Sequence, residues 1–272
     1  MKNNCLVKSV ISLILALMLV CLSYGSAEHS PLSKDHVEHT IQFGTTAFAD
    51  LMNVGGILRY YDETGRVAAS IGLDVSNFNN QIDYSALYNQ GFHFVIIRLG
   101  GRGWGGGGRL YGDDQTWKNL RNAQDAGLRV GAYFYSTAVN VTEAVEDAAS
   151  AISILNGFPL DLPLYIDMEY SGNYPYGRAD RLSPGTRADI ASAFCSAVEA
   201  AGYDSGLYAS EGYLRFDIDA QSISYLPVWM ASYTVDNQLP HYILNYDIWQ
   251  QSDSTWAGGV DGAFDLNIIF RE

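Results

Sequence analysis

The sequence is poor in cysteine and histidine, and each shortage excludes a kind of site. Of three cysteines, Cys5 and Cys21 lie in an N-terminal segment that we expect to be removed, which leaves only Cys195. A single cysteine forms no internal disulfide, and its alanine-rich surroundings predict a small side chain buried on a helix. Of the five histidines, His36 and His39 have the i, i+3 spacing of a metal pair, but no second cluster supports a site, whereas most metal hydrolases use histidine ligands. We therefore predict neither a metal nor a cofactor.

Basic residues are also scarce. The chain has 16 Lys and Arg against 30 Asp and Glu, for a net charge of −14. Removal of residues 1–27, which contain two lysines and no acid, would bring the charge to −16. Such an excess of negative charge disfavours binding to nucleic acid and electrostatic adhesion to anionic surfaces.

Long hydrophobic runs are absent apart from residues 10–22, which are too short for a confident membrane span. Two lysines precede this run and Gly25-Ser26-Ala27 follows it, a pattern typical of a secretory signal. We expect residues 1–27 to be removed and the protein to be secreted or associated with the cell wall, without stable membrane association. Lipidation of Cys21 is an alternative, although the residue before it is a valine and not a small residue.

Aromatic residues are plentiful, with 19 Tyr, 11 Phe and 5 Trp. The 48% hydrophobic content is sufficient for one large core, so part of the aromatic surplus can line a binding groove. A flat apolar ring with a polar edge matches a sugar ring, which favours a saccharide ligand.

From Ser70 onward, strand patterns alternate with helix patterns. The predicted strands are 71–75, 94–99, 128–135, 163–169, 205–209, 227–233, 246–251 and 264–270, and the predicted helices are 84–90, 116–126, 141–155 and 184–201. This alternation predicts parallel strands joined by crossovers. We expect an α/β fold, a modified TIM-like (β/α) barrel of eight strands with helices missing or short around the last ones. The barrel would span residues 70–272, after an extension at 28–69 that ends in a β-hairpin at 57–69.

Two carboxylates end the fourth predicted strand, in the sequence L-P-L-Y-I-D-M-E-Y at 162–170. Side chains two residues apart in a strand share a face, so Asp167 and Glu169 should lie close together. Such a pair raises the pKa of one member and leaves the other ionised, which is the division that glycoside cleavage needs. A solvated strand end would give the same two letters, so the pair alone does not decide.

Two further acids belong to the first and last strands. Asp74 and Asp265 each follow apolar residues, and the first and last strands of a closed barrel are neighbours. We therefore expect both to face Asp167 and Glu169 across the barrel mouth. Between strands, the glycine-rich segment 100–112 lacks the Lys-Ser or Lys-Thr of a phosphate-binding loop. It is interpreted as a flexible loop over the mouth, with Trp104 able to stack on a sugar.

An ordered set of segments resembles the glycoside hydrolase family 25 muramidases. The carrying segments are G-L-D-V-S at 72–76, I-D-Y at 82–84, F-V-I-I-R at 94–98, V-G-A-Y-F-Y-S at 130–136, L-P-L-Y-I-D-M-E at 162–169, G-L-Y-A-S at 206–210, V-W-M-A-S-Y at 228–233, I-W-Q at 248–250 and G-A-F-D-L-N at 262–267. Departures occur at Asn79-Asn80, Tyr84 and Phe134, which leave the substrate preference open.

The resemblance implies cleavage of the β-1,4 bond between N-acetylmuramic acid and N-acetylglucosamine in peptidoglycan strands. We expect the protein to be a monomer. It implies that Glu169 is the general acid/base and that Asp167 stabilises a 2-acetamido group acting as internal nucleophile, with Asp74 and Asp265 completing the acidic floor. Direct attack by Asp167, or inversion, stays open. The side chains expected to bind substrate are Arg98, Trp104, Tyr133, Tyr135, Tyr208, Trp229 and Trp249.

Three other classes of function are weighed against this one. A non-catalytic glycan-binding barrel would not need all four acids. A chitinase-like glycosidase would carry a D-x-x-D-x-D-x-E run, which the residues around Asp167 do not form. A wall amidase or peptidase would need a Cys-His, Ser-His or zinc arrangement, and Cys195, His93 and His241 have no recognisable spacing for one.

Overall fold

The computed structural model describes residues 51–54, 57–60, 69–79, 81–172, 177–233, 240 and 246–270. The predicted signal segment and residues 28–50 lie outside this part of the chain. Within it, none of the helices combines the length and the apolar character needed to cross a bilayer.

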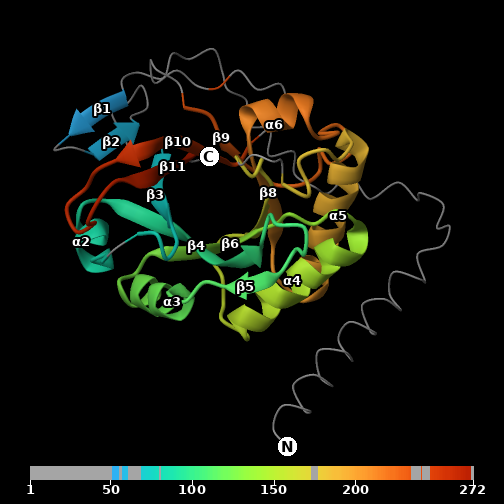
Figure 1. Ribbon diagram of the computed structural model, residues 1–272. Coiled ribbons are helices and arrows are strands. Elements are labelled where there is room, and N and C mark those ends of the chain that lie inside the picture. The colour runs from blue at the N-terminus through green and yellow to red at the C-terminus, as the bar shows by residue number, and fades with distance from the viewer. Residues whose placement is uncertain are drawn as a thin grey trace, which may run out of the picture. The chain divides into compact units, whose positions relative to one another are not determined.

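Eight strands close into a barrel (Figure 1). They are β3 (Ala69–Val75), β4 (Phe92–Arg102), β6 (Arg129–Tyr135), β7 (Leu164–Asp167), β8 (Ser205–Ser210), β9 (Val228–Ala231), β10 (Ile248–Thr255) and β11 (Phe264–Phe270). The barrel closes because β3 pairs with both β4 and β11. The predicted modified TIM-like barrel is confirmed.

The last strand runs against the others. The strands from β3 to β10 in the barrel pair in parallel with their neighbours, whereas β11 is antiparallel to both β10 and β3. The expectation of parallel strands throughout is therefore wrong for β11. The physical reason is the connection: only residues 256–263 join β10 to β11, and a parallel return needs a longer crossover.

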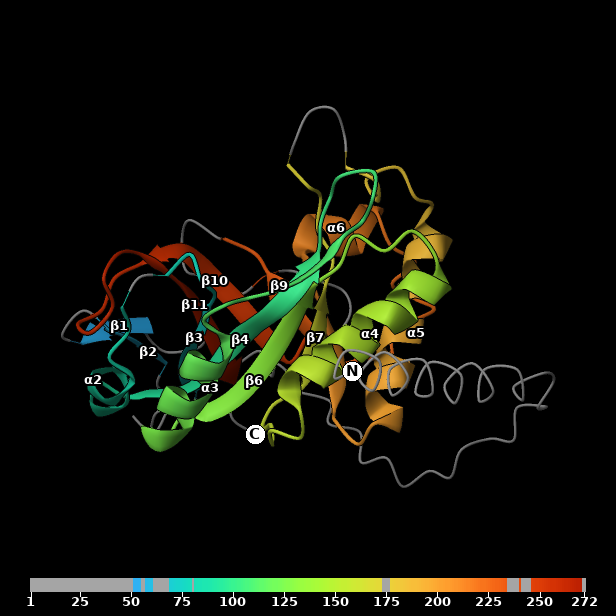
Figure 2. The same ribbon diagram turned by 60° about the horizontal axis from the view of Figure 1, so that its bottom comes forward.

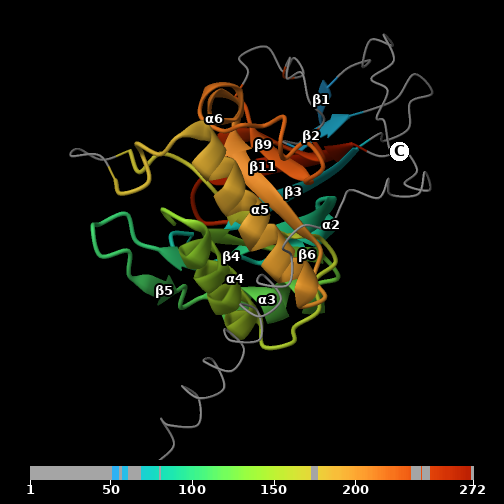
Figure 3. The same ribbon diagram turned by 90° about the vertical axis from the view of Figure 1, so that its right-hand side faces the viewer.

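Helices follow the earlier parallel strands and thin out later, as predicted. They are α2 (Tyr84–Asn89), α3 (Thr116–Asp125), α4 (Val141–Leu155), α5 (Pro184–Ala200) and the short α6 (Glu211–Phe216). Figure 3 shows α4 and α5 side by side on the outside of the barrel. The predicted start of α5 is confirmed, because the Ser183 side chain accepts a hydrogen bond from the Thr186 amide and Pro184 follows it. Gly91, Gly127 and Gly202 follow helices with φ of 94°, 85° and 87°, as predicted for left-handed caps.

The glycine-rich segment expected to be a loop over the mouth is a hairpin, whose ends pair as strands and whose residues 103–109 form the connecting loop. Strand β5 (Leu110–Gly112) pairs antiparallel with the end of β4, so that Gly100 lies opposite Gly112 and Arg102 lies opposite Leu110. The strands approach so closely that a Cβ on Gly100 would lie 2.2 Å from the Tyr111 carbonyl oxygen, which explains the glycine there. Helix α6 and strand β5 are elements that the sequence pattern did not predict.

A separate two-stranded antiparallel sheet precedes the barrel. It consists of β1 (Leu51–Val54) and β2 (Ile57–Tyr60). The hairpin predicted at 57–69 thus has its first strand paired with residues before it, and the predicted turn at 62–65 lies outside the described residues.

Large side chains fill the barrel interior. Phe94, Ile96, Tyr165, Trp229 and Ile248 form one buried cluster. The rings of Tyr133, Tyr165 and Tyr208 surround Trp229 with centroids 5.8, 5.5 and 4.3 Å away. Because this core occupies the interior, chemistry is confined to the carboxyl-end mouth of the barrel.

Candidate active site

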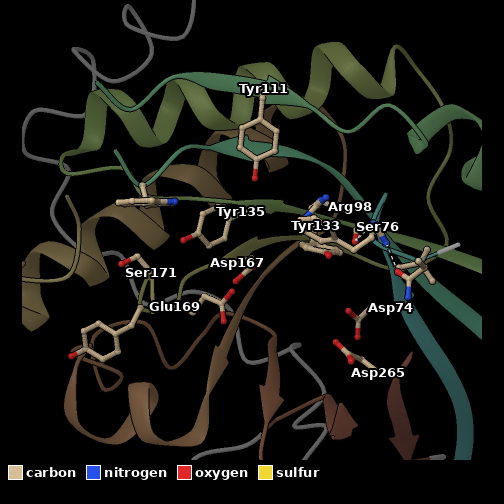
Figure 4. Close-up of a pocket in the computed structure, with 15 residues that line it drawn as sticks. Asp74, Ser76, Arg98, Tyr111, Tyr133, Tyr135, Asp167, Glu169, Ser171 and Asp265 are labelled. Atoms are coloured by element: carbon tan, nitrogen blue, oxygen red, sulfur yellow. Dashed lines mark hydrogen bonds between the residues drawn. The ribbon is translucent and has the colours of Figure 1, made fainter. Parts of the chain in front are cut away.

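A pocket of about 560 Å³ lies at the carboxyl ends of the parallel strands (Figure 4). All four acids predicted from the sequence line it, with aromatic and polar neighbours; the lining residues are Asp74, Val75, Ser76, Phe78, Asn79, Arg98, Trp104, Tyr111, Tyr133, Tyr135, Asp167, Glu169, Tyr170, Ser171 and Asp265.

Asp167 and Glu169 occupy different depths of this pocket. Asp167 is the last residue of β7 and is buried, and its carbonyl oxygen accepts a hydrogen bond of 2.9 Å from the Ser136 amide. Glu169 lies beyond the end of the strand, which was predicted to reach it, and its side chain is exposed at the rim. The Oδ1 atom of Asp167 has no hydrogen-bond partner among the described residues. A buried carboxylate oxygen without a partner is costly, so it favours a ligand donor at that point.

The surroundings hold both carboxyls towards the protonated form. Burial raises the pKa of Asp167 well above its usual value, and the charges of Glu169 and Asp74 add to this while Arg98 opposes it. The pKa of Glu169 is raised by the desolvating pocket wall and then by the charge of Asp265. Because the pKa of both carboxyls is raised, burial alone does not produce the division of roles that the family resemblance implies.

Asp74 and Asp265 form a second carboxyl pair. Oδ2 of Asp74 accepts hydrogen bonds of 2.8 Å from Gln250 Nε2 and from Asn267 Nδ2. Burial and the charge of Asp265 raise the pKa of Asp74 well above normal, and burial and the charge of Asp253 raise the pKa of Asp265 to about 6.

Arg98 is the cation of the pocket and is fixed by its neighbours. Its Nε donates to Asp113 Oδ2 at 2.9 Å and its Nη2 donates to Asn77 Oδ1. The guanidinium also lies over the Phe78 ring, 4.7 Å from the centroid. Held in this way, it provides positive charge that lowers the pKa of Asp167 without forming an ion pair with it.

The residues predicted to bind substrate divide into two groups. Arg98, Trp104, Tyr133 and Tyr135 line the pocket. Tyr208, Trp229 and Trp249 are not among the lining residues, and the two tryptophans are fully buried. Two of them support the site from behind: Tyr208 donates to Gln250 at 2.8 Å and Trp229 to Asn267 at 2.7 Å, and both acceptors donate hydrogen bonds to Asp74. Trp249 donates to the Ser232 carbonyl at 2.8 Å.

Several lining residues were not predicted, notably Ser76, Phe78, Tyr111, Tyr170 and Ser171. Four of them directly follow the ends of β3 or β7, where loops of a barrel reach the mouth. That position was a usable signal for them. Tyr111 belongs to β5, and nothing in its local sequence indicates its place. Among the departures from the family pattern, Phe134 is buried and does not line the pocket.

A closed eight-stranded barrel with four carboxyl groups between aromatic walls defines the class of barrel glycoside hydrolases. Comparison with known families agrees, because the model of the glycosyl hydrolases family 25 matches residues 73–260. The chain belongs to this family.

Individual relatives show the same relationship. The chain is 27% identical over 198 residues to an autolytic lysozyme of Clostridium acetobutylicum, covering 72% of this chain and 54% of that protein. Its fold is similar to the modular autolysin LytC of Streptococcus pneumoniae, solved with a synthetic peptidoglycan ligand (TM-score 0.65, 21% identity, 80% of this chain and 52% of that one). It is also similar to the lysozyme of Streptomyces coelicolor (TM-score 0.62, 23% identity, 75% and 92%). The chain thus spans about half the length of the first two.

Proposed function

We propose that this protein is a secreted or wall-associated muramidase. It would cleave the β-1,4 bond between N-acetylmuramic acid and N-acetylglucosamine in peptidoglycan and act as a monomer without a cofactor. The observation that carries the proposal is the four-acid mouth, in which Asp167 and Glu169 line one pocket with Asp74 and Asp265. Family membership, an autolytic lysozyme relative and a structural neighbour bound to a peptidoglycan ligand support the substrate class.

In this proposal Glu169 begins as the general acid. It donates its proton to the glycosidic oxygen as the bond to the anomeric carbon breaks, and the resulting carboxylate then accepts a proton from the attacking water. Its raised pKa keeps that proton available at mildly acidic pH. Exposure at the rim suits a group that must meet both a sugar oxygen and water.

Asp167 would act on the substrate's 2-acetamido group. Its unpartnered Oδ1 can accept the acetamido N–H, which orients the carbonyl oxygen to attack the anomeric carbon while the leaving oxygen departs. Once the acetamido group develops positive charge, the carboxylate form of Asp167 is favoured over the protonated one. Stereochemical analysis of the product separates an inverting route from this one. Direct attack by Asp167 would retain the configuration as the acetamido route does, and a covalent bond between the sugar and Asp167 would distinguish it.

The test is reducing-end analysis of digested peptidoglycan. New reducing N-acetylmuramic acid supports the proposal, whereas new reducing N-acetylglucosamine or free peptide amines would contradict it. Glu169→Gln should lower the rate by roughly a hundredfold to ten-thousandfold, the usual worth of a general acid. Asp261→Asn is the matched control, because this acid is exposed on the turn between β10 and β11 and does not line the pocket. Glycan binding without turnover by the wild type would instead favour a non-catalytic binding barrel.

A further inference from the structure

The β4–β5 hairpin carries two aromatic side chains into one wall of the pocket. We call residues 100–112 the hairpin wall; it includes Trp104 and Tyr111, which line the pocket and remain 45% and 40% exposed. Figure 2 shows the connection between these strands extending past the end of the barrel. Its tip is rich in glycine, which loses much conformational freedom when ordered and offers no side chain for packing. Something else must therefore hold the tip.

Arg102 is the first anchor. Although charged, it is only 5% exposed. Its Nε donates to Asp147 Oδ1 at 2.7 Å and its Nη2 to Glu146 Oε2 at 2.9 Å, both on α4, while Nη1 donates to the Gly108 carbonyl at 3.1 Å. The other oxygen of Asp147 accepts a 2.6 Å hydrogen bond from Ser136. One guanidinium thus joins the tip of the hairpin wall to a helix outside the barrel.

Arg178 is the second anchor and comes from a distant segment. Its two terminal nitrogens donate to the two carboxylate oxygens of Glu143 on α4 at 2.6 and 2.7 Å. Its backbone amide donates to the Trp104 carbonyl at 3.2 Å. The guanidinium packs against Gly108, where a Cβ would lie 2.2 Å from Nη1 and where φ is +50°. Because its side chain is paired and packed in this manner, Arg178 holds the backbone of Trp104 in place.

We infer that the Glu143–Arg178 pair is a positioning pair that holds Trp104 as a preformed wall for one sugar ring of a glycan strand. Removing charged groups from water costs free energy. The presence of two arginine–carboxylate pairs at a glycine-rich tip is explained if they make the hairpin wall rigid. A wall ordered in advance lowers the entropic cost of binding a long, flexible polymer. The role in substrate binding rests on the proposed function; the rigidity of the wall does not.

The rigidity is tested by hydrogen exchange of the full chain without substrate. Arg178→Ala should increase the exchange rates of amides in the hairpin wall, such as those of Gly103 and Gly108, by about tenfold, while β6 to β8 stay protected. Arg178→Lys should restore part of the protection, because an ammonium keeps the charge but not the two-pronged geometry. Arg215→Ala, which breaks an exposed pair with Glu211 on α6, should leave the hairpin wall unchanged. Equal exchange in wild type and Arg178→Ala would overturn the inference.

The substrate role is tested by kinetics on polymeric peptidoglycan. Arg178→Ala should raise KM by about tenfold while kcat stays within about twofold, since the acids are untouched and only the ordering cost changes. Faster exchange with an unchanged KM would overturn the role in substrate binding. If the wild type releases no reducing N-acetylmuramic acid, the proposed function is contradicted instead. The exchange experiment would still test whether the Glu143–Arg178 pair makes the hairpin wall rigid.

Discussion

Asp74 and Asp265 are direct cross-strand partners on β3 and β11, the first and last strands of the barrel. Asp265 is the second residue of its strand, and it reaches the mouth because β11 runs antiparallel to the rest. In a parallel strand the same residue would lie at the opposite end of the barrel. The reversed strand therefore brings this carboxyl to the pocket, where its charge acts on both Asp74 and Glu169.

Replacing Asp265 should change the pH dependence of activity. The charge of Asp265 raises the pKa of Glu169, so Asp265→Asn lowers that pKa. If Glu169 acts as a protonated acid, the basic limb of the kcat profile should move to lower pH. Rates of reducing-end release across pH measure the limb. A basic limb that stays in place or moves upward would contradict the assigned coupling.

The same carboxyl pair should make stability depend on pH. In the folded state the pKa of Asp265 is about 6 and that of Asp74 is also raised, whereas the pKa of an aspartate in the unfolded chain is about 3.9. The folded state thus keeps protons that the unfolded chain has lost, and the free energy of unfolding should fall as pH rises from about 4 to about 6.

Asp265→Asn should reduce this fall by about 1–2 kcal/mol, less than the two-unit shift in pKa alone would give, because the side chain is partly open to solvent. Urea denaturation at pH 4, 5, 6 and 7 provides the measurement. The exposed Asp261→Asn control should follow the wild-type curve. Identical slopes for Asp265→Asn and wild type would rule out this linkage.

Arg98 should set the acidic limb of the activity profile. Its charge lowers the pKa of Asp167, so Arg98→Gln should raise that pKa and shift the acidic limb to higher pH. The reason is that Asp167 must be ionised to stabilise the acetamido group in the proposed mechanism. An unchanged acidic limb, with activity lost equally at every pH, would mean that Arg98 contributes only to binding.

Two tryptophans predicted for the same role should behave differently when replaced. Trp104→Ala should raise KM by about five- to tenfold with unchanged stability, because the ring lines the pocket and is half-exposed. Trp229→Phe should cost about 1–3 kcal/mol of stability, since it leaves the buried Asn267 oxygen without its donor. Thermal unfolding and steady-state kinetics on both variants separate the two roles. A large KM change for Trp229→Phe at constant stability would restore it as a substrate contact.

Local sequence patterns predicted much of the fold. Glycine after three helices and serine before Pro184 marked the helix ends, and the strand–helix alternation predicted the barrel. These patterns also predicted the four acids as site residues, because a carboxylate in an apolar strand costs free energy unless it has a function or a partner. Arg98, Trp104, Tyr133 and Tyr135 were predicted to bind substrate, and all four line the pocket.

By itself, then, the sequence determined the alternation of elements, the barrel and the acids at its mouth, since these follow from periodicity and from residue chemistry along short stretches. Only the tertiary structure decided the direction of β11, the burial of Trp229 and Trp249, and the hydrogen bonds by which Arg102 and Arg178 join the hairpin wall to α4. Each of these depends on partners far away in the chain. How deep in the barrel a strand residue lies is fixed by register against its neighbours, and a short stretch of sequence does not record that register.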